Sequence, residues 1–181
     1  MKQKQTKRMI TVGMLSAIAI VLTFIKFSLP FLPPYLTIDF SDAPALLATF
    51  TLGPVAGLLV ELIKNLLNFF FNLSDPVGPI ANFLAGASLL LVSYGIYRNN
   101  QSTKHLILGL ITGTIVMTIV LAVMNYFVLL PLYGMIMNLT DIANNLKLII
   151  AAGIIPFNII KGALISIIFI LLYQRIGHIL K

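Results

Sequence analysis

Six apolar stretches alternate along the chain with short polar or proline-rich segments. Their expected bounds are 9–29, 43–52, 55–72, 80–97, 106–130 and 146–173. A helix that crosses the hydrocarbon core of a bilayer needs roughly 20 mostly apolar residues, and only the second stretch falls far short of that length. The pattern therefore predicts an all-α membrane protein in which residues 1–181 form a single bundle of six transmembrane helices.

Proline and glycine mark the ends of these stretches. The proline-rich run 30–34 follows the first stretch, and Gly53-Pro54 separates the second from the third. Proline cannot donate a backbone hydrogen bond and its ring clashes with the preceding turn, so we expect Pro131 to end the fifth helix. Pro156 lies inside the sixth stretch, where we expect it to kink the helix.

The composition excludes the common soluble classes of protein. Hydrophobic residues make up 59% of the chain and charged residues 9%, whereas a soluble domain carries about 25% charged residues. A soluble domain of this size would leave too much apolar surface in water, and a disordered chain would need low hydrophobicity. Cysteine is absent, so there is no disulfide, no thiol nucleophile and no cysteine-ligated metal site.

The net charge of +7 predicts the topology of the bundle. Six helices place both termini on one side, and eight of the twelve basic residues fall there: Lys2, Lys4, Lys7, Arg8, Arg98, Lys104, Arg175 and Lys181. The other side receives Asp39, Asp42, Asp75 and Asp141. Because basic residues collect in cytoplasmic loops, we expect cytoplasmic termini, a basic cytoplasmic tail at 1–8 and a structured first extracellular loop.

Three ionisable side chains lie within the apolar helices, where such groups are costly and usually face the bundle interior. Glu61 and Lys64 are three residues apart and share a helix face, so they either neutralise each other or serve a function. Lys161 has no acidic residue within its own helical turns. Its charge requires a partner on another helix, such as Glu61, or else a water-filled cavity or a ligand.

Two asparagines accompany this lysine on the expected outer side. Asn158 lies one turn from Lys161 in the sixth helix, and Asn125 lies in the outer half of the fifth. Either asparagine would be explained by a helix–helix hydrogen bond, which contributes about 0.6 kcal/mol in membranes. The alternative is that all three residues line a cavity that opens outward.

Motifs for catalysis are absent. The sequence has no P-loop, no His-Glu-x-x-His and no Gly-x-Ser-x-Gly, and its two histidines, His105 and His178, fall at expected helix ends. The basic residues form no nucleic-acid-binding pattern. We therefore expect no enzyme, no resident cofactor, no metal and no nucleic-acid partner, but a protein that binds an uncharged or anionic, partly flat molecule.

Several separated motifs carry a resemblance to a known family. They are Asn125 to Tyr133 in the fifth helix, Ile155 to Gly162 in the sixth, the loop Asp39 to Pro44, and the Gly53-Pro54 break. With these motifs in this order, the chain resembles the substrate-binding S components of energy-coupling-factor (ECF) vitamin transporters over nearly its whole length. Among them it is similar to the riboflavin-specific type.

The resemblance implies a multi-pass subunit of a bacterial cell membrane that captures riboflavin with high affinity from outside. It also implies delivery inward with a separate energising module, made of a transmembrane T component and two cytoplasmic ATPases. In the family, polar side chains of helices five and six meet the flavin ring, which here implies Asn125, Asn158 and Lys161. In the family the first outer loop covers the site, which here implies residues 33–42, with Tyr35, Leu36, Thr37 and Asp39. By position we also expect Thr37, Asp39 and the Gly78 backbone to meet the ribityl hydroxyls, and Phe157 to belong to the aromatic wall of the site.

The first helix carries small residues at a spacing that lets another helix approach closely, namely Gly13, Ser16 and Ala17. The resemblance implies that this face docks on the T component. The family pattern there is two alanines four residues apart, and this chain has Gly13 and Ala17 at that spacing instead.

Two other functions stay open on sequence grounds. The first is an S component for a different vitamin, which would differ in its pocket residues. The second is a solitary small-molecule carrier that uses Glu61 as a proton or ion relay and needs no ATPase partner.

Overall fold

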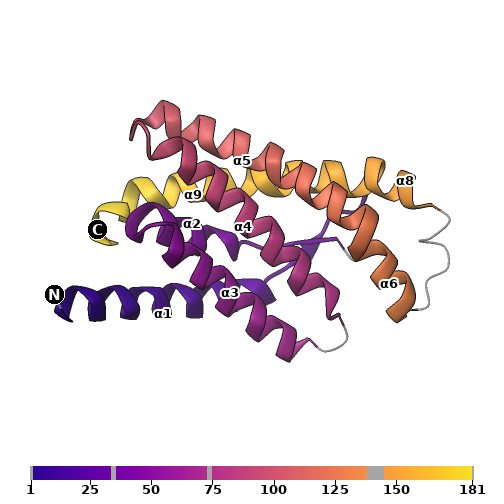
Figure 1. Ribbon diagram of the computed structural model, residues 1–181, viewed down its shortest axis with the longest axis horizontal. Coiled ribbons are helices and arrows are strands. Elements are labelled where there is room, and N and C mark those ends of the chain that lie inside the picture. The colour runs from indigo at the N-terminus through magenta and orange to yellow at the C-terminus, as the bar shows by residue number, and fades with distance from the viewer. Residues whose placement is uncertain (1, 34–35, 73–74, 138–144, 181) are drawn as a thin grey trace.

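In the computed structural model the chain forms an elongated bundle of helices that run back and forth along its long axis (Figure 1). The structure describes residues 2–33, 36–72, 75–137 and 145–180. Tyr35, Asp141 and Lys181, all named above, lie outside these ranges. Both termini lie at one end of the bundle, as does the connection between the fourth and fifth helices (Figure 1).

Four passes are single helices. They are α1 (Lys2–Phe24), α2 (Asp42–Leu52), α3 (Pro54–Phe71) and α4 (Val77–Tyr97). The last two passes each contain a π-helical turn. The fifth consists of α5 (Thr103–Met124), η1 (Asn125–Leu129) and α6 (Leu130–Met137), and the sixth of α8 (Leu146–Ile149), η2 (Ile150–Ile154) and α9 (Ile155–Leu180).

Among the described residues, five helical stretches are long and apolar enough to cross a membrane: Gln3–Phe24, Pro54–Phe71, Val77–Tyr97, Thr103–Met135 and Leu146–Gly177. The remaining helix, α2, has 11 residues. Residues 42–50 of α2 are all buried, so this short helix packs inside the bundle and does not need the length of a span. The all-α architecture with a short second helix is confirmed.

The break between α2 and α3 has a simple backbone cause. Gly53 adopts a φ of 100°. Residues that carry a Cβ atom disfavour this conformation, and glycine does not. Pro54 then begins α3, where its missing N–H costs nothing because the first amides of a helix have no partner within the helix. The predicted Gly53-Pro54 break is confirmed.

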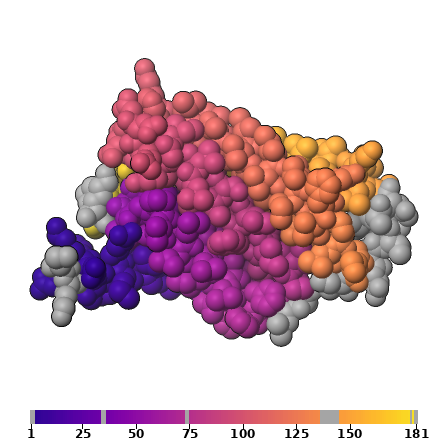
Figure 2. Space-filling model, viewed as in Figure 1, coloured from indigo at the N-terminus to yellow at the C-terminus, as the bar shows by residue number. Residues whose placement is uncertain are grey.

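The first helix differs from its predicted bounds at both ends. It begins at Lys2 and ends at Phe24 rather than running over 9–29, so the basic tail continues the helix. Residues 3–10 are exposed, and this part of α1 projects beyond the body of the molecule (Figure 2). Two short strands of two residues each follow, and β1 (Phe27–Ser28) pairs antiparallel with β2 (Thr37–Ile38).

The prediction that Pro131 ends the fifth helix is wrong, because the pass continues to Met137. The helical turn just before the proline contains one extra residue, and the Leu130 amide donates to the carbonyl of Asn125, five residues back. A π turn of this kind changes the register of the hydrogen bonds. It therefore accommodates a residue that has no N–H and whose ring clashes with the preceding turn of an α-helix.

The sixth pass repeats this solution. Pro156 also follows a π turn, in which the Ile155 amide donates to the carbonyl of Ile150. Both prolines lie six positions after the first residue of their π turn, and η1 contacts η2. Two widened turns thus lie together at one level of the bundle.

Two glycines set the close packing of α5 on α4. A Cβ at Gly109 would lie 2.6 Å from the carbonyl oxygen of Ser93, and one at Gly113 would lie 2.9 Å from that of Leu89. Glycines four residues apart let two helix backbones approach closely within a membrane. Neither position has room for a methyl group unless one helix moves.

We expect Gly109→Ala to lower the free energy of unfolding by about 1–3 kcal/mol, the usual cost of overpacking. Gly95→Ala is the matched control, because a Cβ at Gly95 meets no atom within 4 Å. Thermal unfolding of the purified variants in detergent measures the difference. Equal unfolding midpoints for the two variants would show that the α4–α5 contact tolerates separation.

Candidate functional site

A cavity opens between the first loop, α3, α4 and the two π-containing passes, towards the end of the bundle away from the termini. Its volume is about 830 Å³ with the space at its mouth included. Each predicted substrate-binding residue in the described part of the chain lines it: Leu36, Thr37, Asp39, Gly78, Asn125, Phe157, Asn158 and Lys161. The cavity thus gathers predicted residues that are up to 125 positions apart in the sequence, from Leu36 to Lys161.

The two asparagines have the same local geometry. Asn125 is the first residue of η1, and its side-chain amide donates to the carbonyl of Leu121 at 2.8 Å. Asn158 follows η2, and its amide donates to the carbonyl of Ile154 at 2.8 Å. Each amide therefore satisfies a helix carbonyl, which leaves the remaining polar groups of the side chain for the cavity.

Asn158 has an unused acceptor. Its Oδ1 atom is buried and has no hydrogen-bond partner among the described residues. A buried polar atom without a partner costs about 1–3 kcal/mol, and Asn158 lines the cavity. The site therefore offers an acceptor to a ligand that carries an N–H or O–H group.

Lys161 meets partners on two other helices. Its Nζ atom donates to Oδ1 of Asn82, on α4, at 2.9 Å, and lies 3.4 Å from Oδ2 of Asp42 at the start of α2. The lysine is 1% exposed. Its charge is thus met within the bundle, by Asp42 rather than by Glu61.

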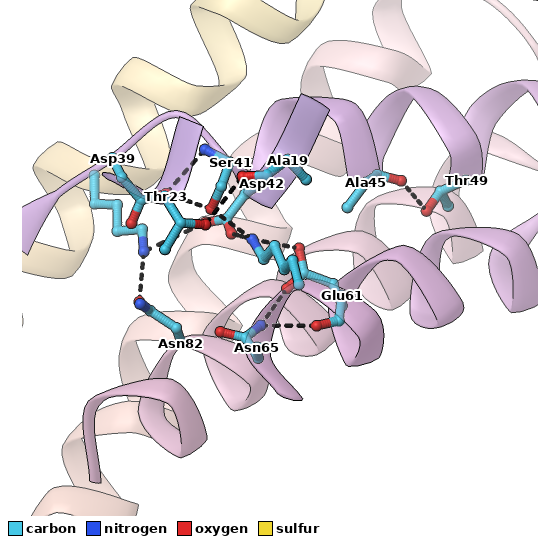
Figure 3. A network of polar contacts seen from close by, with 12 residues as sticks. Ala19, Thr23, Asp39, Ser41, Asp42, Ala45, Thr49, Glu61, Asn65 and Asn82 are labelled. Atoms are coloured by element: carbon cyan, nitrogen blue, oxygen red, sulfur yellow. Dashed lines mark hydrogen bonds and ion pairs between the residues drawn. The ribbon is translucent and has the colours of Figure 1, made fainter. Parts of the chain in front are cut away.

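Asp42 belongs to a buried ionic cluster formed by Asp39, Asp42, Glu61, Lys64 and Lys161, each at most 2% exposed. Asp42 forms a salt bridge with Lys64, whose Nζ also lies 3.1 Å from Oε1 of Glu61. Figure 3 shows Asp42 and Ser41 facing Glu61 across the helices. Lys64 also donates to Oγ of Ser41 at 2.8 Å.

The cluster corrects one prediction and extends another. Asp42 was expected as a loop charge on the outer side, but it is the first residue of α2 and is 2% exposed. A carboxylate in the first turn of a helix is favoured by the helix dipole. Glu61 and Lys64 do pair, as one of the two open readings predicted, and Lys64 has Asp42 as a second acidic partner.

A glycine on the neighbouring helix α4 leaves the space that the Glu61 carboxylate occupies. The Glu61 carboxylate lies against Gly86 of α4, where a Cβ would overlap it. The Asn65 amide donates to Oε2 of Glu61 at 3.1 Å. Neither Glu61 nor Lys64 lines the cavity, so the cluster has an inner part, around Lys64, and a part that reaches the cavity through Lys161 and Asp39.

Sequence reasoning missed a further set of polar residues in the cavity wall: Thr23, Lys26, Asn68, Asn72, Asp75, Asn82 and Tyr133. Asn68 and Asn72 are four residues apart on α3, and this helical spacing is the signal that would have assigned them to one wall. The Tyr133 hydroxyl donates to Oδ1 of Asp75 at 2.6 Å, and the Gly78 amide donates to the same atom at 2.9 Å. That pair of bonds ties α6 to the start of α4.

The three small residues of α1 separate onto two faces. Gly13 and Ala17 are exposed, whereas Ser16 is 2% exposed and faces the bundle. A Cβ at Gly13 meets no atom within 4 Å. The exposed small face therefore consists of Gly13 and Ala17, flanked by the exposed apolar side chains of Ile10, Met14, Ile18 and Val21.

Comparison with known proteins matches the chain to a family over most of its length. The model of the family "ECF transporter, substrate-specific component" matches residues 7–173. The riboflavin transporter RibU of Staphylococcus aureus (strain TCH60) is 71% identical over 181 residues, which are 100% of this chain and 96% of that protein. The riboflavin transporter FmnP of Bacillus subtilis (strain 168) is 40% identical over 176 residues, covering 95% and 93% of the two chains.

A solved structure agrees with the family match and with the two relatives. It is described as the structure and mechanism of the S component of a bacterial ECF transporter, and it superposes on this chain with a TM-score of 0.86. The two chains are 68% identical, and the match covers 98% of this chain and 99% of that one. The fold and the sequence therefore point to the same family.

We expect Lys64→Met to lower the free energy of unfolding by about 3–5 kcal/mol, because it leaves Asp42 and Glu61 buried without their shared cation. Lys104→Met is the control, since Lys104 is exposed in the first turn of α5. The unfolding midpoint in detergent measures the effect. A loss no larger than that of Lys104→Met would mean that the buried cluster contributes little to stability.

Proposed function

The chain belongs to the substrate-specific components of ECF transporters, and from this premise we propose that it binds riboflavin and presents it to an energising module. It is a membrane protein and the substrate-binding part of a transporter, not an enzyme. The observation that carries the proposal is the cavity wall that brings Asn125, Asn158 and Lys161 together. The names of the relatives, both riboflavin transporters, supply the ligand.

The polar wall suits the pyrimidine edge of the isoalloxazine ring, which has an N–H group between two carbonyl oxygens. The unpartnered Oδ1 of Asn158 accepts from that N–H. Lys161 has three donors, and a donor not used by Asn82 or Asp42 serves a flavin carbonyl. A ligand without this pattern would leave buried groups unpaired, at a cost of about 1–3 kcal/mol each.

The remaining walls suit the other parts of riboflavin. Leu121, Leu130, Ile154 and Phe157 form apolar surface for the dimethylbenzene side of the ring. Thr37, Asp39 and the Gly78 backbone, together with Asn68, Asn72 and Asp75, offer hydrogen bonds to the ribityl hydroxyls. The first loop covers this end through Leu36.

Orientation in the bacterial cell membrane follows from the charges. The two termini and the α4–α5 connection lie at one end of the bundle, and the basic residues of these segments outnumber those at the other end. That end is cytoplasmic by the usual rule. The cavity then opens to the outside, where the vitamin is captured.

The exposed face at Gly13 and Ala17 docks on the T component, which works with two cytoplasmic ATPases. Support comes from the family and from the open space around Gly13. Ser16 is buried and supports α1 from within.

A solitary ion-coupled carrier finds less support. Glu61 is 0% exposed, pairs with Lys64 and does not line the cavity. The bundle is also closed near the termini, where the ring of Phe50 packs at 4.9–5.9 Å from the rings of Tyr94, Tyr97, Phe169 and Tyr173. A ligand in the cavity has no path through that cluster.

We expect the purified protein to quench riboflavin fluorescence on binding, and Asn158→Ala and Lys161→Met each to weaken binding by about 10-fold to 100-fold through loss of buried hydrogen bonds. Titration with riboflavin measures the Kd. The control is Asn100→Ala, at an exposed position between α4 and α5. Unchanged affinity in both pocket variants, or no binding by the wild type, would refute the riboflavin assignment.

We expect Gly13→Leu to abolish co-purification with the T component and ATP-dependent uptake while riboflavin binding by the isolated chain is unchanged. A leucine side chain holds a neighbouring helix away from a small-residue face. Gly95→Leu places the same side chain in open space on α4 and should leave assembly intact. Normal assembly of Gly13→Leu would locate the docking face elsewhere.

A further inference from the structure

The lysine in the cavity wall is held by an acid that is not part of that wall. Lys161 lines the cavity, whereas Asp42 does not. The nearest distance between the two charged groups is 3.4 Å, from Nζ to Oδ2. Asp42 therefore has no contact with a ligand in the cavity and influences one only through Lys161.

Two partners fix the direction of the lysine. An ammonium group has three N–H donors. One is used by Oδ1 of Asn82 at 2.9 Å, whereas Oδ2 of Asp42, 3.4 Å away, forms an ion pair with the ammonium and accepts no hydrogen bond. The two partners come from different helices, α4 and α2. The hydrogen bond fixes one donor and the ion pair draws the ammonium towards α2, so together they restrict the directions of the remaining donors.

Asp42 is itself held from the opposite side. Its Oδ1 forms the salt bridge with Lys64, and Lys64 is held in turn by Glu61 and by Oγ of Ser41. Figure 3 shows Asp42 and Ser41 between Glu61 and Asn82. One carboxylate thus separates two buried lysines, each 1% exposed.

We propose that Asp42 and Asn82 are positioning residues for substrate binding: they hold the Lys161 ammonium, by an ion pair and a hydrogen bond, so that its remaining donors face the ligand. This inference rests on the proposed binding of riboflavin in the cavity. Without Asp42, Lys161 loses its nearest counter-charge, and its repulsion from Lys64 is no longer screened by the carboxylate between them. The ammonium then turns away from the position in which it meets a flavin carbonyl.

A double-mutant cycle tests this coupling. Riboflavin affinity is measured by fluorescence titration for Asp42→Asn and for Asn82→Ala, each in the wild-type chain and in Lys161→Met. In the wild-type chain we expect Asp42→Asn to weaken binding about 10-fold or more, and Asn82→Ala about 3-fold to 10-fold. In the Lys161→Met background both effects should fall to about 2-fold or less, because the group that they position is gone.

Glu61→Gln is the matched control for Asp42→Asn. It also replaces a buried carboxylate of the cluster by an amide, but among the described residues Lys64 is the one ion-pair partner of Glu61, and Glu61 lies outside the cavity wall. We expect its affinity for riboflavin to stay within about 2-fold of the wild type, with a lower unfolding midpoint. A loss as large as that of Asp42→Asn would show a general disturbance of the cluster and would overturn the proposal.

The other outcomes are equally decisive. Equal losses with and without Lys161 would show that Asp42 and Asn82 support the fold or contact the ligand themselves, which also overturns the proposal. If Asp42→Asn does not fold, the Asn82→Ala cycle decides alone. If the wild type fails to bind riboflavin, the proposed function fails, and a ligand-free crystal structure of Asn82→Ala still shows whether the Lys161 ammonium has moved.

Discussion

The bundle depends on one buried carboxylate, that of Asp42, which lies between a lysine of α3 and a lysine of α9. Charges withdrawn from water are costly unless they are paired at close range, so α2, α3 and α9 have to meet at this point. The short α2, which ends at the Gly53-Pro54 break, carries the shared acid at its first residue and is buried over residues 42–50. Gly86 on α4 completes the arrangement by leaving space for Glu61.

The π turns that precede the two prolines shape the site together with the ionic cluster around Asp42. A π turn before Pro131 and another before Pro156 widen both passes at the level where they touch. Asn125 begins the first turn, and Asn158 lies one helical turn after the second, in α9. Single π turns are found frequently at functional sites, and here they place two amides and a lysine on the wall of one cavity.

The apolar pattern was sufficient to predict the five helices of the described residues that are long enough to cross a membrane, because burial in a bilayer demands length and hydrophobicity and little else. Asn125, Asn158 and Lys161 were recognisable as polar residues in apolar helices. Asp42 was not recognisable as a buried residue, because an acidic residue next to a loop is expected to be solvent-exposed, and only tertiary packing shows that it is covered. The prediction that Pro131 ends the fifth helix failed for a related reason. The rule that proline ends a helix assumes α geometry on its N-terminal side, and here a π turn replaces that geometry.

The position of these features along the bundle fits the proposed separation of capture from delivery. The cavity lies at the end away from the termini, the ionic cluster adjoins it, and the aromatic rings around Phe50 pack together nearer the termini. A ligand held by buried polar groups gains affinity from this enclosure. The packed rings also separate the cavity from the end that holds the termini. Under the proposed function, release at that end therefore requires the bundle to change, and this is the step that we assign to the proposed energising partners.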